Sequence, residues 1–384
     1  MRTGFLATHI AFILLNVPQA LAPNYATLVV FRFFAGGCAT VLANTAASVI
    51  GNVWKEEHER TIPMSMYVTA YLAGIGMGPV VGAAVLQSLN WRWINWVQMI
   101  IHAALFPIYY FFYEESRNTA ITEQVLGNST DEISVERTVR PISFSRRFAT
   151  SIKRPLHMLI TEPVLLVFTL WSAFSVGAVY VFTQSTEQVF GAIHDWTAIQ
   201  SGYVQAAVVI GSCIGGSAAY ISSKFYAASA RRNRENPGKP IPEARLYMSV
   251  IGSIVGVSGG MFIYGWTSYH KDPWLAPTVG LVLVGGGSVI IVNAAADYLV
   301  DIYTAFAGSA VAAVVLGENI VAAFLPLASQ SMYTRLGFQW ASTVLGLVSL
   351  MFALAPVALI YWGGSIRARS AYVRVANLGS RVSR

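Results

Sequence analysis

Long apolar stretches alternate with short polar segments along the whole chain. Ten of these stretches are close to twenty residues or longer, and about twenty apolar residues are what an α-helix needs to cross a bilayer. Only helices and closed barrels satisfy every backbone polar group in lipid, and stretches of this length are helical. The pattern therefore predicts an all-α polytopic membrane protein with ten transmembrane helices. The predicted spans cover residues 4–22, 26–49, 62–88, 93–113, 157–183, 198–221, 246–266, 275–296, 305–328 and 341–362.

Two longer polar segments set the predicted domain organisation. We expect residues 1–113 to form an N-terminal half of four transmembrane helices and residues 156–362 to form a C-terminal six-helix bundle. Residues 114–155 would then be a cytosolic central loop and residues 363–384 a basic cytosolic tail. Between residues 142 and 154 of the loop, apolar and basic residues alternate, which predicts an amphipathic stretch lying on the anionic inner leaflet. A solvated linker is the alternative.

Composition agrees with a membrane protein and excludes other classes. Hydrophobic residues make up 55% of the 384 residues and charged residues only 11%, against about 25% charged in soluble domains. The formal net charge of +7 does not indicate a nucleic-acid partner, because the basic residues lie between apolar stretches. The two cysteines, Cys38 and Cys213, lie inside apolar stretches, which excludes a disulfide-built secreted fold.

The positions of the basic residues predict the orientation in the membrane. With both termini in the cytosol, 21 of the 25 lysines and arginines fall on the cytosolic side or in the tail. The other four are Arg32, inside a span, and Arg92, Lys271 and Arg335, on the opposite side. Cytosolic loops carry the excess of Lys and Arg in membrane proteins, so we expect both termini in the cytosol.

Ionisable residues inside the spans are the first candidates for function, since a charge at the bilayer centre costs about 2.5–3.5 kcal/mol on insertion scales. Arg32 lies six residues into the second span; it is either a fixed cation facing a polar cavity or a structural group bound to helix-end carbonyls. Glu318 is the only carboxylate well inside an apolar stretch. It is either a proton carrier or a group that caps a kink or pairs within the bundle.

Other polar residues near the spans carry weaker expectations. His9 and His102 are expected to be lone, hydrogen-bonded structural histidines. Asp297 and Asp301 are expected in water at the cytosolic mouth of the eighth span, and Glu162 lies at the cytosolic start of the fifth.

Glycines recur at a spacing that allows close helix packing. The sets are Gly74, Gly78 and Gly82; Gly211 and Gly215; and Gly252, Gly256 and Gly260. The triplet Gly285–Gly287 predicts a bend in the eighth span, of the kind that marks binding sites in transporters. The chain has no phosphate-binding loop, no H-E-x-x-H motif and no Cys/His cluster, so we expect no catalytic residues, no metal and no cofactor.

Several motifs resemble those of the fungal drug:proton antiporters, the multidrug or polyamine-type exporters of the major facilitator superfamily. LVVFRFFAGG resembles a fourth-helix motif of that family, with Arg32 as its arginine. GIGMGPVVGA resembles the fifth-helix antiporter motif G-x-x-x-G-P-x-x-G-G, with only the last glycine replaced, by Ala83. Shorter matches are WRWINW, PEARL, YGWTS, DYLVDIY and AFLPL. The resemblance covers nearly the whole chain and implies the major-facilitator helix bundle, divided here into four plus six helices.

The sequence departs from that family at its start. Full members have twelve spans, and the first span here corresponds to their third. Their first two helices and the following loop motif G-x-L-x-D-R-x-G-R-[KR] are not in the sequence. A misplaced start codon and a truncated form are both open. In addition, Glu318 stands where many relatives carry Arg.

The resemblance implies proton-coupled efflux of small organic molecules, such as drugs, toxins or secondary metabolites, by alternating access. The protein would be a monomer in the plasma membrane. Arg32 would tune a nearby proton affinity, and Glu318 is the second candidate for proton coupling. The antiporter-motif face would pack against a neighbouring helix; its residues are Gly74, Gly78, Pro79 and Gly82. The candidates for the substrate cavity are Asn44, Trp171, Tyr180 and Asn293.

Three other functions stay open on the sequence. The chain could be a truncated, non-transporting membrane protein, or a facilitator or importer of the same fold. An intramembrane enzyme built on His9 or His102 is the third.

Overall fold

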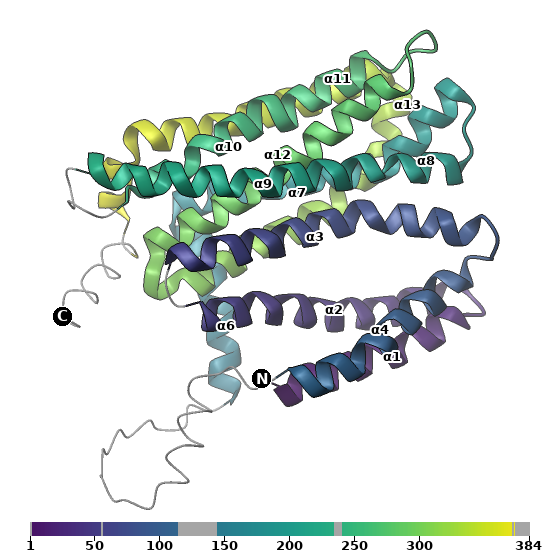
Figure 1. The fold of residues 1–384 in the computed structure, drawn as a ribbon, viewed down its shortest axis with the longest axis horizontal. Coiled ribbons are helices and arrows are strands. Elements are labelled where there is room, and N and C mark those ends of the chain that lie inside the picture. The colour runs from purple at the N-terminus through teal and green to yellow at the C-terminus, as the bar shows by residue number, and fades with distance from the viewer. Residues whose placement is uncertain (1, 55–56, 114–143, 234–239, 371, 373–384) are drawn as a thin grey trace, which may run out of the picture. The chain divides into compact units, whose positions relative to one another are not determined.

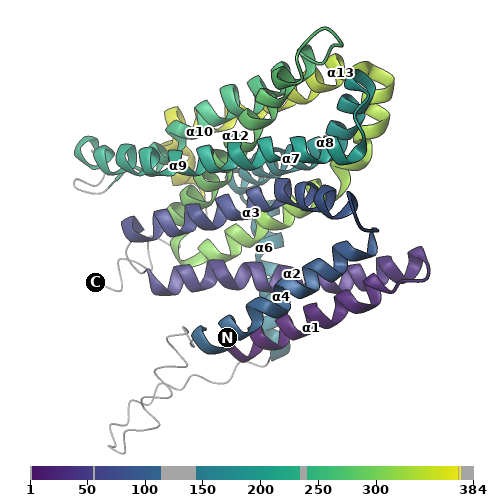
Figure 2. The same cartoon turned by 45° about the vertical axis from the view of Figure 1, so that its right-hand side comes forward.

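The computed structural model describes residues 2–54, 57–113, 144–233, 240–370 and 372. These residues form helices joined by short connections, and no strand occurs among them. Figures 1 and 2 show the individual helices. By its internal contacts the chain divides into two compact units. The N-terminal unit holds residues 1–67 and 81–139, and the C-terminal unit holds residues 68–80 and 140–384. The middle of one helix, 68–80, thus belongs to the unit formed by the second half of the chain.

The N-terminal unit contains three complete helices and the two ends of a fourth. They are α1 (Arg2–Ala20), α2 (Tyr25–Val53), α4 (Arg92–Phe112) and the ends of α3 (Glu57–Leu86). Helix α1 packs against both α2 and α4. The turn between α1 and α2 is fixed by Asn24, whose side chain accepts a hydrogen bond from the backbone N–H of Thr27 at 2.8 Å. This is an N-cap, which satisfies one of the free N–H groups at the start of α2.

The C-terminal unit contains the remaining elements. In chain order they are α6 (Phe144–Thr161), α7 (Pro163–His194), α8 (Ala198–Val204), α9 (Ala206–Ser229), η1 (Ala230–Arg232), η2 (Pro242–Leu246), α10 (Tyr247–Ile251), η3 (Gly252–Gly259), α11 (Gly260–Trp266), α12 (Leu275–Tyr303), η4 (Thr304–Phe306) and α13 (Ala307–Arg369). The segment η3 is a π-helix between α10 and α11. Helix α13 is two helices joined at Gly337, whose φ of 78° lies in the region that favours glycine.

Nine helices in the described part of the chain are long and apolar enough to span a membrane. The last of them contains the break at Gly337, so its two parts correspond to the last two predicted spans. The prediction of an all-helical membrane fold is therefore confirmed. Residues 114–143, in the predicted central loop, and most of the predicted tail, 373–384, lie outside the described residues.

The fifth predicted span, 157–183, was placed wrongly at both ends. Residues up to Thr161 belong to α6, and α7 starts at Pro163, because the extended Glu162 (φ −109°, ψ 98°) separates the two helices. Proline at the first helical position is favoured, since its missing N–H would be unpaired there anyway. At the other end α7 continues to His194. The end of the predicted loop, from residue 144, is therefore helical.

Glycines place α12 in backbone contact with two neighbours. From α9, Gly211 and Gly215 approach the backbone of α12 at Val282 and Gly286. On the other side, a Cβ atom on Gly256 of η3 would lie 2.6 Å from the Cα of Gly287, and one on Gly260 would lie 2.7 Å from the carbonyl oxygen of Gly280. We call this set of contacts the glycine seam. The predicted packing roles of the two glycine sets in α9 and η3 to α11 are therefore confirmed.

The helix is not interrupted at Gly285–Gly287, where the sequence predicted a bend of the kind that interrupts transporter helices. Helix α12 continues through the three glycines, which are buried. Each approaches a neighbouring backbone: a Cβ on Gly285 would lie 2.6 Å from the Val208 carbonyl oxygen, and one on Gly287 would lie 2.5 Å from that of Gly252. The triplet therefore serves the glycine seam on both faces of α12. The irregularity lies instead in the neighbouring η3, which is a π-helix.

We expect Gly256→Ala to destabilise the C-terminal unit by roughly 1–3 kcal/mol, the usual cost of overpacking. The added methyl group would meet backbone atoms of α12, which cannot turn aside as a side chain can. The readout is a lower melting temperature of the purified protein in detergent. Gly308→Ala in α13 is the matched control, because a Cβ there meets nothing within 4 Å. Equal melting temperatures for the two variants would contradict the glycine seam.

Candidate functional site

A carboxylate lies at the contact between α7 and α13. Glu318 of α13 is 4% exposed, and the hydroxyl of Ser172 on α7 donates a hydrogen bond of 2.5 Å to its Oε1. The two helices approach closely on either side, with Gly317 against Thr169 and Gly177 against Val321. Small residues at the contact thus bring the helices near enough for a serine to reach the glutamate.

The surroundings of Glu318 do not supply an opposite charge. Within the described residues, no ion pair to Glu318 is formed within 4 Å, and its hydrogen-bond donor is the neutral Ser172. An ionised carboxylate removed from water needs a cation or several donors to compensate for lost hydration. A proton or a bound cation can therefore compensate the charge of Glu318 at this position.

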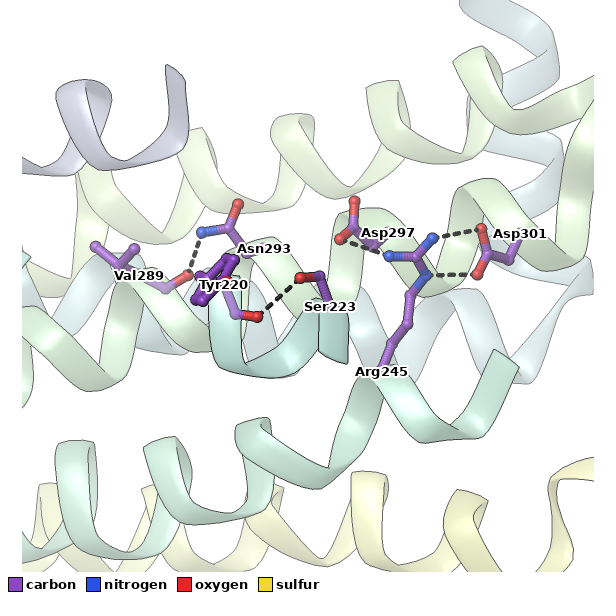
Figure 3. A network of polar contacts seen from close by, with 7 residues as sticks. All are labelled: Tyr220, Ser223, Arg245, Val289, Asn293, Asp297 and Asp301. Carbon is purple, nitrogen blue, oxygen red and sulfur yellow. Dashed lines mark hydrogen bonds and ion pairs between the residues drawn. The ribbon is translucent and has the colours of Figure 1, made fainter. Parts of the chain in front are cut away.

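A second polar group joins η2 to α12 (Figure 3). Arg245 of η2 contacts two carboxylates on α12, with Nε 2.5 Å from Asp301 Oδ2 and Nη1 3.0 Å from Asp297 Oδ2. The guanidinium also lies over the ring of Tyr226, 3.9 Å from its centroid. The side chains of Arg245 and Asp301 are 5% and 7% exposed. These residues form what we call the arginine clamp.

The arginine clamp corrects the expectation that Asp297 and Asp301 lie in water. Asp297 is 26% exposed, but Asp301 is buried, and both are ion-paired. The sequence contained a signal that the prediction did not use. The two aspartates are four residues apart, on one face of a helix, and PEARL supplies a nearby arginine, Arg245.

Further polar contacts join other helix ends of the same unit. Arg367 Nε of α13 lies 3.0 Å from Glu243 Oε1 of η2. Glu162, 2% exposed, accepts a hydrogen bond from the Tyr303 hydroxyl at 3.2 Å and another from the backbone N–H of Tyr372 at 3.2 Å. Glu162 thus connects the start of α7 to the end of α12 and to the segment after α13, a role that its position in the sequence did not indicate.

The predicted cavity residues occupy different surroundings. Trp171 is 2% exposed and its indole donates a hydrogen bond to Ser253 Oγ at 3.1 Å, so it packs in the core between α7 and η3. Asn293 is 9% exposed and donates to the Val289 carbonyl at 3.1 Å (Figure 3). Tyr180 is partly buried. Asn44, in the N-terminal unit, is exposed and lies on a polar stripe of α2 with Thr40, Thr45 and Ser48.

Arg32 and the antiporter-motif glycines have few contacts among the described residues. Arg32 is exposed on α2 and forms no hydrogen bond or ion pair there. A Cβ on Gly74, Gly78 or Gly82 would meet nothing within 4 Å. The close contact of α3 is made by Gly76 instead, on another face, where a Cβ would lie 3.1 Å from Val208 Cβ. The packing role of the motif, Pro79 included, and the role of Arg32 stay predictions.

The two intramembrane histidines are not isolated, contrary to expectation. His102 Nδ1 lies 3.3 Å from His9 Nε2, joining α4 to α1. His9 is 1% exposed, and the rings of Phe12, Phe106 and Tyr109 lie within 6 Å of the pair. An i to i+3 or i+4 spacing could not have revealed this pair, because its members are 93 residues apart. Within the described residues, no group of three or more potential metal ligands accompanies it.

Comparison with known proteins identifies the fold and the relatives. The family profile of the Major Facilitator Superfamily matches residues 1–326. The chain is 30% identical to the ascochitine biosynthesis cluster MFS transporter of Didymella fabae, over 96% of this chain and 72% of that protein. It is 29% identical to the efflux pump bik6 of Gibberella fujikuroi, over 93% of this chain and 74% of that protein. The crystal structure of the human organic anion transporter MFSD10 matches with a TM-score of 0.64 and 16% identity, over 92% of this chain and 76% of that one.

We expect Arg245→Met to destabilise the protein by about 3–5 kcal/mol, the cost of removing one partner from a buried ion pair. The variant leaves Asp301 buried without its cation. The measurement is the melting temperature of the purified protein. Arg231→Met removes an exposed arginine from η1 and is the matched control, with an expected change within about 0.5 kcal/mol. An Arg245→Met protein as stable as the control would show that the arginine clamp does not hold η2 to α12.

Proposed function

The chain belongs to the Major Facilitator Superfamily and is a multi-pass membrane transporter rather than an enzyme, and we propose that it exports small organic molecules in exchange for protons. Export would proceed by alternating access, in which helix bundles rock about a central site and proton binding shifts the population of the two states. The single observation that carries the proposal is the burial of Glu318 at the contact between α7 and α13.

Glu318 has the properties that proton coupling requires. It is buried inside a predicted span, and the described residues give it one neutral donor, Ser172, and no cation. Because no described cation compensates the charge of Glu318, binding or release of a proton directly changes the free energy of the contact between α7 and α13. A conformational change that moves α7 against α13 would in turn change the access of water to Glu318. The two events are therefore coupled in both directions.

The direction of transport and the class of substrate rest on the relatives and on the sequence. One relative is described as an efflux pump and another as the transporter of a biosynthesis cluster, which favours export of secondary metabolites or similar organic molecules. The antiporter motif around Gly78 and Pro79 supports the same direction by resemblance. In this proposal the positive charge of Arg32 attracts anions and repels cations near the transport pathway. The side chains of Asn44, Tyr180 and Asn293 supply polar groups along that pathway.

We place both termini in the cytosol and the protein in the plasma membrane as a monomer. The distribution of 21 of 25 basic residues supports this orientation. The arginine clamp, the Glu243–Arg367 pair and Glu162 all lie at helix ends that this orientation assigns to the cytosol. Ion pairs are less costly at such ends than within the bilayer core.

We expect Glu318→Gln to abolish proton-driven transport while leaving exchange intact. Glutamine keeps the shape and can still accept the hydrogen bond from Ser172, but it cannot bind and release a proton. The measurement uses proteoliposomes with an acidic lumen, and the transported probe is ethidium, a lipophilic organic cation. Ethidium accumulation should fall to the level of protein-free vesicles, and exchange of ethidium across the membrane without a pH gradient should persist.

Glu187→Gln is the matched control, because Glu187 is an exposed carboxylate on α7 and its loss should leave accumulation unchanged. Full pH-driven accumulation in the Glu318→Gln protein would exclude Glu318 as the proton carrier. Ethidium movement that never depends on the pH gradient, even in the unmodified protein, would indicate a facilitator of the same fold.

A further inference from the structure

A cationic depression lies at the surface of the C-terminal unit, beside α6. It has a volume of about 490 Å³ and is lined by Ala149, Thr150, Lys153, Arg154, His157 and Tyr372. None of these six residues is acidic, and three of them are basic. We propose that this depression binds the phosphate-bearing headgroup of an anionic lipid of the inner leaflet.

The wall of the depression is fixed by Tyr372. Its hydroxyl lies 2.9 Å from His157 Nδ1, and its ring packs edge-on against Phe306 with centroids 5.2 Å apart. Its backbone N–H donates to Glu162 Oε1. Three contacts therefore hold Tyr372 against α6 and the start of α7, so the depression is a built feature rather than a gap beside a lone helix.

The cations of the depression are available for a ligand. Lys153 and Arg154 are exposed, and no ion pair joins either of them to a residue that the structure describes. The Arg154 guanidinium lies over the ring of Phe306, 5.6 Å from its centroid, which positions the group without neutralising it. The nearby carboxylate of Glu162 is turned to other partners, since both of its oxygens accept hydrogen bonds from tyrosines. A phosphate is the group that two such cations and a histidine would recognise.

The neighbouring face of α6 indicates a lipid rather than a soluble phosphate. Ile152, Leu156 and Ile160 follow each other at four-residue spacing and are 48%, 42% and 84% exposed. This apolar stripe adjoins the cationic side of the helix, as in helices that lie at the boundary between headgroups and acyl chains. Helix α6 also ends two residues before the membrane-spanning α7 begins at Pro163 and runs across the direction of α7 (Figures 1 and 2). One molecule with a phosphate and acyl chains fits both surfaces.

The test is native mass spectrometry of the purified full chain in detergent, titrated with phosphatidylserine or phosphatidylcholine. The unmodified protein should bind phosphatidylserine in preference. Two basic residues near an anionic surface contribute about 1 kcal/mol each, so Lys153→Gln/Arg154→Gln should weaken phosphatidylserine binding about thirtyfold. The control Lys224→Gln/Arg231→Gln removes the same charge from exposed positions on α9 and η1 and should leave the affinity within about twofold.

Three results would overturn the proposal. The first is unchanged phosphatidylserine binding in Lys153→Gln/Arg154→Gln, and the second is an equal loss in the control, which would mean a general charge effect. The third is full competition by soluble glycerophosphoserine at equal concentration, which would make the ligand a free phosphate ester. The melting temperature of each lipid-free variant verifies folding, and exposed positions should leave it unchanged. None of these results depends on proton coupling or on Glu318.

Discussion

Backbone-to-backbone contact along α12 is the constraint on which the C-terminal unit depends. In lipid, apolar side chains gain little by leaving the acyl chains for one another, so helices associate through close packing. The glycine seam provides that packing on two opposite faces of α12, with Gly256 on one side and Gly215 on the other. It fixes the rotation of α12 about its axis, and this rotation directs Asp297 and Asp301 to Arg245.

The polar groups of the unit divide into two kinds. At the helix ends, Arg245, Arg367 and Glu162 all have partners of opposite charge or hydrogen-bond donors, and they connect elements that are far apart in the sequence. Inside the bundle, the residues that the structure describes give Glu318 a single neutral donor. Paired groups stabilise one arrangement, while a carboxylate without a counter-ion responds to protons. The first kind therefore holds the unit together, and the second is where a change of protonation would act on it.

The sequence predicted the helices and the small-residue faces of α9 and of η3 to α11 well, because both depend on local composition. A stretch such as 275–296 is apolar throughout, and Gly252, Gly256 and Gly260 share one face whatever the tertiary structure is. Long-range partners were beyond such reasoning. The pairing of His9 with His102 and of Arg245 with Asp301 depends on helix rotation and depth, which composition does not fix. The same limit explains the error at Gly285–Gly287. The loss of helix propensity was read correctly, but the two neighbouring backbones that offset it are set by tertiary packing.

The position of Glu162 has a consequence for how the protein is made. Its two donors, Tyr303 and Tyr372, lie 141 and 210 residues further along the chain. During synthesis α7 is made before either donor exists, so Glu162 gains both hydrogen bonds only after the chain extends to Tyr372. A protein cut between Tyr303 and Tyr372 could insert most of its helices and still leave Glu162 without its second donor. The contact thus makes the start of α7 depend on a residue that is added 210 positions later in the chain.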